Sequence, residues 1–322
     1  MIARLKGALD PYIIALLLTV VLASLLPARG GFAQAMGIIA DAGIVLLFFL
    51  HGAKLSREAL VAGAGHWRLH LTVLAATFAL FPLLGLSIAA IPGVPAVVAT
   101  GMLFLTLLPS TVQSSIAFTS IARGNVAAAV CSASFSNFLG IFLTPLLVAL
   151  LMGSAGAGFS WDAVEKIVLQ LLMPFLAGHL LRPVVSGFVA RHKPLVGYVD
   201  RGSIVLVVYT AFSAAVVEGL WHRVPPNMLL LIALLCAVLL ALALGLTWLA
   251  GRALGLTRAD AIVLLFCGSK KSLASGVPMA GVLFPAPQMG AVILPLMLFH
   301  QLQLIACAVI ARRYAAAAEP GE

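Results

Sequence analysis

Two adjacent lysines lie in the middle of the apolar segment 259–284, far from both of its ends. A cation at the centre of a membrane span costs about 2.5–3.5 kcal/mol on insertion scales, so such a residue is a functional candidate. Positive charges and helix N-termini attract anions, so Lys270 and Lys271 predict a site for an anionic group. Adjacent residues of a helix point about 100° apart, so both cannot face one pocket equally, and the sequence leaves open which one does. The same segment carries three candidate hydroxyls, Ser269, Ser272 and Ser275.

A second polar run interrupts the apolar segment 95–122 directly after Pro109. Proline removes a backbone donor and clashes with the preceding helical turn. In lipid the freed carbonyls need partners, so such a break persists only inside protein or along a wet cavity. Pro109 and the polar residues that follow it are therefore further candidates for substrate or ion binding: Ser110, Thr111, Gln113, Ser114 and Ser115.

Segment 125–152 adds Ser132, Ser134 and Asn137, which could offer oxygen ligands or serve equally well as polar contacts between helices. Asp41 is the one acid well inside an apolar segment and could pair with a lysine. We interpret the remaining polar residues of the apolar segments as packing or interface groups, with a proton-relay role as the alternative: His179, His300, Gln301 and Gln303.

Other chemistries find no support in the sequence. All four cysteines fall inside apolar segments without a C-x-x-C spacing, and we interpret them as packing residues. His66 and His70 are four residues apart but flank Trp67 and Arg68, which favours an interfacial role over a metal site. Phosphate-binding and zinc-protease motifs are absent, as is a nucleophile–base pair, so we expect neither an enzyme nor a resident cofactor.

The composition indicates the elements that must position these residues. The chain has 322 residues, of which 63% are hydrophobic and only 9% charged. Soluble domains carry roughly 25% charged residues, and ten acids with nineteen bases cannot cover the surface of a soluble fold of this size. The sequence therefore predicts an all-α polytopic membrane protein, whose partner is the lipid bilayer.

A helical span needs about 20 apolar residues, and the apolar runs are continuous rather than alternating. We expect ten spans, at about 12–27, 35–52, 69–91, 95–122, 125–152, 164–182, 201–219, 227–250, 259–284 and 289–311. The polar stretch 183–200 is expected to be a cytoplasmic linker.

The basic residues predict the orientation. With a cytoplasmic N-terminus, fourteen of the nineteen Lys and Arg residues fall on the cytoplasmic side, three fall outside and two lie inside a span. This bias places both termini in the cytoplasm, in a bacterial inner or plasma membrane. The net charge of +9 is then a topology signal rather than a sign of nucleic-acid binding.

The two interrupted segments are the fourth and the ninth spans, which are the fourth members of two successive groups of five. Interrupted helices at matching positions of two halves are typical of inverted-repeat transporters with a site near the bilayer midplane. An odd number of spans per half requires the halves to have opposite orientation. We therefore divide the chain into a first repeat at 1–152, a sixth helix and linker at 153–200, and the rest of the second repeat at 201–322.

Several stretches resemble a known family. The sequence after the fourth span, ARGNVA at 122–127, looks like the crossing-helix region of the bile acid:sodium symporter superfamily, which comprises solute carrier family 10 and bacterial relatives. Nearly the whole chain resembles the divergent branch related to the seventh member of that family. The motifs that carry this likeness are FLHGAKLSREAL at 49–60, HWRLHL at 66–71, FP at 81–82, Pro109, FLGIFLTPLL at 138–147 and FCGSKKSLASGVPM at 266–279.

The resemblance implies a panel domain, at about 12–52 and 164–219, and a core domain, at about 69–152 and 227–311. In the core, spans four and nine would cross at their breaks, and substrate would bind between the domains beside this crossing. The domains would move against each other for alternating access. The family activity is sodium-coupled uptake of amphipathic organic anions such as bile acids.

The chain departs from the sodium-binding pattern that the family implies. Sodium-coupled members carry a Glu in the ninth span followed by Gln-Asn-Ser-Gly, and aligning Ser-Gly on Ser275 and Gly276 places Ser269 at the Glu position. A sodium ion close to the neighbouring lysines is electrostatically disfavoured. We hypothesise that a lysine ammonium takes the structural role of a sodium ion, with coupling by protons or no coupling.

The sequence thus predicts a secondary transporter of a small or amphipathic organic anion, with sodium or a proton as the possible coupling ion. The alternative is a membrane regulator of ion homeostasis, such as calcium entry, that transports no anion itself. The substrate and the oligomeric state are left open.

Overall fold

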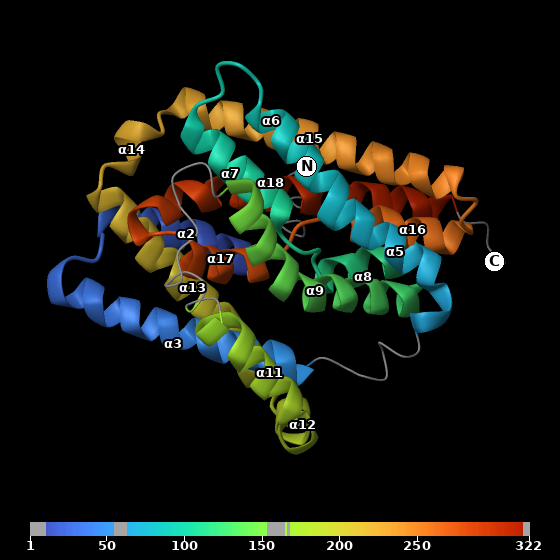
Figure 1. Ribbon diagram of the computed structural model, residues 1–322, viewed down its shortest axis with the longest axis horizontal. Coiled ribbons are helices and arrows are strands. Elements are labelled where there is room, and N and C mark those ends of the chain that lie inside the picture. Colours follow the sequence, from blue (N-terminus) through green and yellow to red (C-terminus); the bar gives the residue numbers. More distant parts are fainter. Residues whose placement is uncertain (1–10, 55–62, 153–164, 166–167, 318–322) are drawn as a thin grey trace. The chain divides into compact units, whose positions relative to one another are not determined.

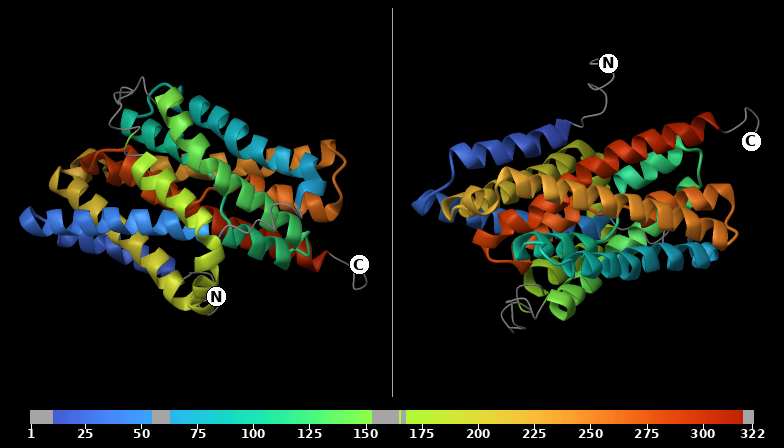
Figure 2. Two further views of the ribbon diagram at one scale, coloured as in Figure 1. Left: turned by 60° about the horizontal axis from the view of Figure 1, so that its bottom comes forward. Right: turned by 90° about the horizontal axis from the view of Figure 1, so that it is seen from above.

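The computed structural model describes residues 11–54, 63–152, 165 and 168–317. Within these ranges every regular element is a helix (Figures 1 and 2). The chain divides into two compact units, the first with residues 1–55, 159–225 and 277–293 and the second with 56–158, 226–276 and 294–322. The predicted panel and core domains stay a prediction.

The first unit contains the early helices and the helices around residue 200. These are α2 (Pro11–Leu25), α3 (Gly30–Lys54), the π-helical turn η4 (Val168–Leu172), α11 (Met173–Leu180), α12 (Arg182–Arg191), α13 (Lys193–Val217) and α14 (Leu220–Arg223). The second unit contains the helices on which both polar breaks lie. These are η1 (Gly63–His66), α5 (Trp67–Ala75), the π-helical turn η2 (Ala76–Leu80), α6 (Phe81–Ala89), α7 (Ala96–Leu107), α8 (Gln113–Ile121), α9 (Val126–Met152), α15 (Pro226–Ala253) and α16 (Arg258–Gly268). Two helices contribute to both units, α17 (Leu273–Leu283) and α18 (Ala286–Ala316).

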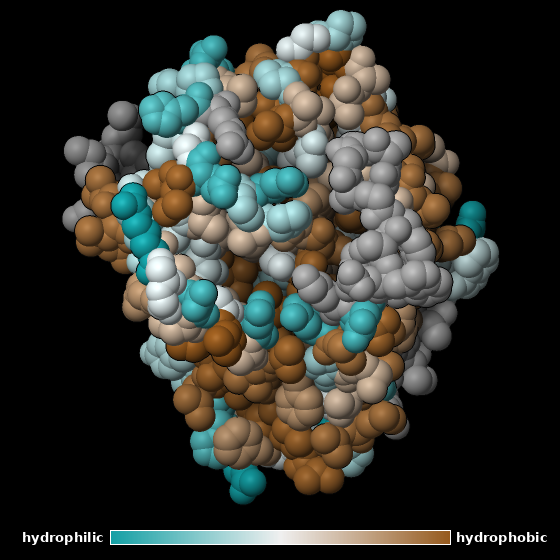
Figure 3. All heavy atoms as spheres, turned by 60° about the vertical axis from the view of Figure 1, so that its left-hand side comes forward, coloured by the Kyte–Doolittle hydropathy of each residue, from teal (hydrophilic) through white to brown (hydrophobic). Residues whose placement is uncertain are grey.

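The protein is a polytopic integral membrane protein. In the described ranges six helices, or seven if one bent pair counts as a span, are long and apolar enough to cross a bilayer. Many large hydrophobic side chains of these helices are exposed, such as Leu150 and Leu230, and hydrophobic side chains cover broad areas of the face seen in Figure 3. Lipid is the solvent that makes such a surface stable. The other expected spans are short, broken or bent in the structure, so the count of ten stays a prediction.

The segment 183–200, which the sequence predicted to be a cytoplasmic linker, is helical. Residues Arg182–Arg191 form α12, which is bent by 89° from the preceding helix, and α13 already begins at Lys193. Prolines 183 and 194 stand in the first turns of these two helices, where the missing N–H costs nothing. None of the residues of α12 is buried, so the polarity that predicted a linker belongs to an exposed helix.

Two glycines hold α3 and α11 together in the first unit. A Cβ atom on Gly52 would lie 2.0 Å from the carbonyl oxygen of Phe175, and one on Gly178 would lie 1.9 Å from that of Phe49. Only glycine allows the two backbones to approach this closely, which is the usual device of helix pairs in lipid.

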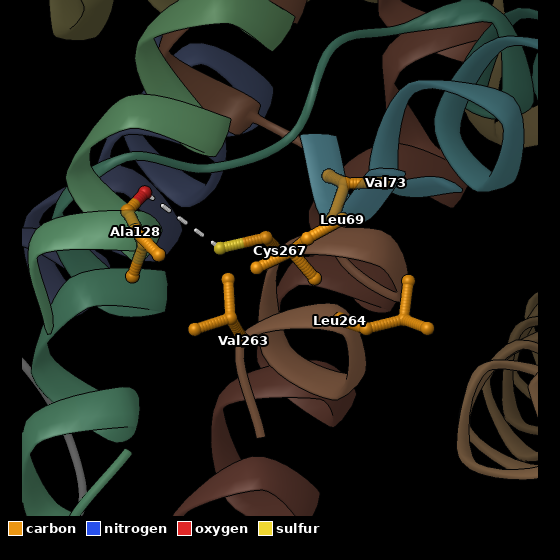
Figure 4. Packing of buried hydrophobic residues seen from close by; sticks show 7 residues of the cluster. Leu69, Val73, Ala128, Val263, Leu264 and Cys267 are labelled. Carbon is orange, nitrogen blue, oxygen red and sulfur yellow. Dashed lines mark hydrogen bonds between the residues drawn. The ribbon is translucent and has the colours of Figure 1, made fainter. Parts of the chain in front are cut away.

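A buried apolar cluster anchors α16 in the second unit (Figure 4). Val263, Leu264 and Cys267 of α16 pack against Leu69 and Val73 of α5 and against the alanines of α9. Cys267, the last residue of the cluster in sequence, directly precedes Gly268, at which α16 ends. The cluster therefore fixes the position of the polar break that follows.

Candidate functional site

Two helix breaks face each other inside the second unit. Helix α7 ends at Leu107, and Leu108 is extended before α8 begins at Gln113. Helix α16 ends at Gly268 and α17 begins at Leu273. The N–H of Ser272 donates to the carbonyl of Pro109 over 2.9 Å, so the breaks touch through their backbones. The breaks lie where Pro109 and the Gly/Ser run predicted them.

At the break after α7, the five successive carbonyls of residues 106–110 accept hydrogen bonds from groups outside the helix. The carbonyls of Thr106 and Leu108 accept from Lys271. The carbonyls of residues 107, 109 and 110 accept from Thr144 Oγ1 over 2.8 Å, from Ser272 N and from Asn137 Nδ2 over 2.8 Å. A break buried in a membrane protein must satisfy these groups internally, because no water replaces them.

The end of α16 is satisfied from the opposite break. Ser115 Oγ donates to the carbonyl of Phe266 over 3.0 Å, and Ser110 Oγ donates to that of Cys267. Ser269 Oγ turns back to the carbonyl of Leu265. The serines after Pro109 thus hold the two breaks together, which is a structural role in addition to any contact with substrate.

Lys271 is fully buried and bound on all sides. Its Nζ donates to the carbonyl oxygens of Thr77, Thr106 and Leu108 over 2.8, 2.8 and 2.7 Å. Its backbone N–H and C=O are both bound by the Gln303 side chain over 2.9 Å. This lysine has no donor left for a substrate.

Lys270 is equally buried but weakly held. Its one hydrogen bond among the described residues runs to Ser114 Oγ over 3.3 Å. The ammonium otherwise lies over aromatic rings, 4.6 Å from the centroid of Phe118 and 5.7 Å from that of Phe266. A lysine with unused donors beside the first turn of α8 is the better candidate to meet a substrate.

The remaining hydroxyls form two small networks at the crossing. Thr111 Oγ1 is hydrogen-bonded to Ser115 Oγ over 2.8 Å and accepts from Ser114 Oγ over 2.9 Å. Ser272 Oγ caps α17 through the N–H of Ser275, whose own hydroxyl donates to Asn137 Oδ1 over 3.0 Å. Asn137 therefore joins the two breaks, as one of the two sequence interpretations allowed.

Three predicted residues lie apart from these networks. Ser132 Oγ pairs with His70 Nδ1 over 2.7 Å, on the face of α9 that meets α5. Ser134 is half-buried and Gln113 is exposed, and in the described part of the chain the hydrogen bonds of the crossing include neither.

Sequence reasoning missed the groups that hold Lys271. Three of them are backbone carbonyls, which carry no residue-type signal. Gln303 was interpreted as a packing or interface group, and its specific role was not predicted: it is fully buried and binds both backbone groups of Lys271. A buried amide in an apolar helix is the one signal that could have pointed to it.

Asp41 belongs to a different place. It lines a cavity of about 390 Å³ in the first unit, with Gln34, Thr210 and Ser213 as the other polar lining groups. In the described ranges no group of three or more His, Cys, Asp and Glu side chains could hold a metal ion. His66 Nδ1 lies 3.4 Å from Asp260 Oδ2.

Known proteins match nearly the whole of this sequence. Residues 10–316 match the model of the SBF-like CPA transporter family. The chain belongs to this family. The match confirms the resemblance to the bile acid:sodium symporter superfamily, whose members are transporters rather than enzymes.

The matches to similar relatives extend over most of both chains. An uncharacterized protein of Pseudomonas aeruginosa is 59% identical over 309 residues, which are 95% of this chain and 93% of the relative. YfeH of Escherichia coli, whose name proposes a symporter, is 54% identical over 97% of this chain and 94% of its own length. Sodium/bile acid cotransporter 7 of Rattus norvegicus is 26% identical over 83% of this chain and 80% of its own.

Proposed function

We propose that this protein is a secondary active transporter that moves a small or amphipathic organic anion across the bacterial inner membrane by alternating access. Membership of a transporter family and the printed names of YfeH and cotransporter 7 support a transport function. The division of the chain into two compact units supports a mechanism in which a panel moves against a core. Ten spans in two inverted repeats, with both termini in the cytoplasm, complete the proposed architecture.

The environment of Lys270 is the observation that supports an anionic substrate. The ammonium lies beside Ser114, in the first turn of α8, where the helix dipole is positive. Two positive features therefore lie side by side, with one long hydrogen bond to Ser114 between them. A carboxylate or sulfonate that reached this place would accept from the ammonium and from the helix N-terminus at once.

The same arrangement argues against sodium coupling at this place. Ser269 stands where sodium-coupled members carry a carboxylate, and its hydroxyl is already bound to the carbonyl of Leu265. A sodium ion here would have no charged ligand and would face the Lys270 ammonium. We therefore propose coupling to protons, or transport without coupling.

Uptake into proteoliposomes tests this function. Radiolabelled taurocholate and a series of shorter carboxylates and sulfonates would be offered under sodium, potassium and pH gradients. We expect saturable uptake of at least one anion that does not depend on sodium. Lys270→Met should abolish it, because the variant keeps most of the apolar side chain and loses the charge.

Lys193→Met is the matched control, since it removes an exposed lysine at the start of α13 and should leave uptake unchanged. The proposal fails if folded protein takes up none of the anions, which would favour a regulator. It also fails if uptake by Lys270→Met equals that of the wild type.

A further inference from the structure

The Lys271 side chain ends in a cage of three backbone carbonyls. The carbonyl oxygens of Thr77, Thr106 and Leu108 lie 2.7–2.8 Å from Nζ. An ammonium has three N–H donors, so each carbonyl receives one, whereas a neutral amine has only two and would turn its lone pair toward the third. Three acceptors around Nζ therefore favour the charged form.

The carbonyl of Thr77 is free because of the local backbone, independently of the lysine. In the π-helical turn η2 a hydrogen bond joins residues that are five positions apart in the sequence, as the bond from the N–H of Phe81 to the carbonyl of Ala76 shows. The next donor in this series would be residue 82, which is a proline without an N–H. Pro82 thus leaves the carbonyl of Thr77 without its helical donor.

The other two carbonyls come from the end of α7. Thr106 lies in its last turn, where carbonyls have no helical partner, and Leu108 precedes Pro109 in the break. The C-terminal end of a helix carries a partial negative charge, so all three oxygens and the dipole favour a cation. The cage is a cation-binding arrangement built by the backbone.

Aromatic rings complete the cage. Nζ lies 4.2 Å from the ring centroid of Phe81 and 5.9 Å from that of Phe78, and both ring faces attract positive charge. Carbonyl oxygens around a dehydrated ion are the ligands that monovalent cations find in selective membrane sites.

We propose that the carbonyls of Thr77, Thr106 and Leu108 form a monovalent-cation site that the protein fills permanently with its own Lys271 ammonium. The ligand is tethered, so the second unit carries a fixed positive charge and needs no ion from solution to hold α6, α7 and the break before α17 together. Removal of the side chain opens the same site to a small alkylammonium ion. This inference does not depend on the proposed transport function.

Chemical rescue of truncated variants tests the site. Lys271→Ala removes the atoms that correspond to propylammonium, and Lys271→Gly removes those of butylammonium. Thermal unfolding of each purified variant would be followed in detergent at constant ionic strength, with the chloride salt of each amine replacing sodium chloride. At about five times its dissociation constant, an amine should raise the melting temperature by about 2–4 °C. Each variant should respond most strongly to the amine of matching length.

Lys270→Ala is the matched control, because it removes an equally buried ammonium that lies in no carbonyl cage. Its melting temperature, like that of the wild type, should not respond to either amine. 1-Propanol should rescue nothing, because it has the shape of the missing group without its charge.

Two results would overturn the proposal. One is an absence of amine rescue in both truncated variants, and the other is equal rescue of Lys270→Ala. If the truncated variants do not fold, Lys271→Met provides the test, because it retains most of the apolar side chain and removes only the ammonium. Its melting temperature should lie below that of Lys270→Met, and an equal or higher value would contradict a cation site at the cage.

Discussion

The same neutral replacement should destabilise the protein at Lys271 and change its stability little at Lys270. Lys271→Met leaves three buried carbonyls, those of Thr77, Thr106 and Leu108, without donors. Each unsatisfied buried group costs about 1–3 kcal/mol, so the loss is about 3–9 kcal/mol. The variant also escapes the cost of holding a cation in the membrane, about 2.5–3.5 kcal/mol. We expect a net loss in the free energy of unfolding of about 3 kcal/mol.

Lys270→Met loses much less. One hydrogen bond of 3.3 Å to Ser114 and the contacts with Phe118 and Phe266 contribute about 1–3 kcal/mol together. The relief of the buried charge offsets this amount, so stability should change by less than about 1 kcal/mol. The two variants have the same composition and differ only in which ammonium is removed.

Thermal unfolding in detergent measures the difference. At about 2–4 °C per kcal/mol, Lys271→Met should unfold roughly 6–12 °C below Lys270→Met. Tryptophan fluorescence and size-exclusion after heating would report the two transitions. Equal melting temperatures, or a lower one for Lys270→Met, would refute the assignment of Lys271 as the strongly bound ammonium and of Lys270 as the weakly bound one.

Two further substitutions test the packing and the support of the site. Gly178→Ala places a Cβ atom 1.9 Å from the carbonyl of Phe49 and should cost about 3 kcal/mol or more of stability. The expected readout is a loss of monodisperse protein. Gly187→Ala is the control, because the space around this residue is open, and it should be neutral or slightly stabilising. Gln303→Leu removes both backbone partners of Lys271 and should cost about 2–6 kcal/mol in thermal unfolding; a melting temperature equal to that of the wild type would contradict this role.

The helix breaks were predictable because their cause is local. Pro109 lacks an N–H, and the run around Gly268 and Ser269 favours no regular helix, so both interruptions follow from residue type. The composition likewise predicted a membrane protein. The helical conformation of residues 183–200 was not predicted, because polarity alone does not distinguish an exposed helix from a loop.

The roles of the two lysines depended on contacts that no local pattern contains. Lys271 meets the carbonyls of Thr77 and Thr106, which lie 194 and 165 residues away in the sequence. Whether a carbonyl is free depends on a π-helical turn, on Pro82 and on the place where α7 ends. Gln303 was likewise identified only by its contact with the break.

Residue types alone predicted that this chain lies in a membrane, that two of its apolar segments are interrupted and that two lysines lie at one of the interruptions. Hydrophobicity, proline and charge are properties of single residues, so they can be read without a fold. The three-dimensional contacts were needed to show that all three donors of the Lys271 ammonium are bound, whereas the Lys270 ammonium has one hydrogen bond among the described residues. The physical reason is that the cost of a buried charge depends on its neighbours, and here these come from three distant helices.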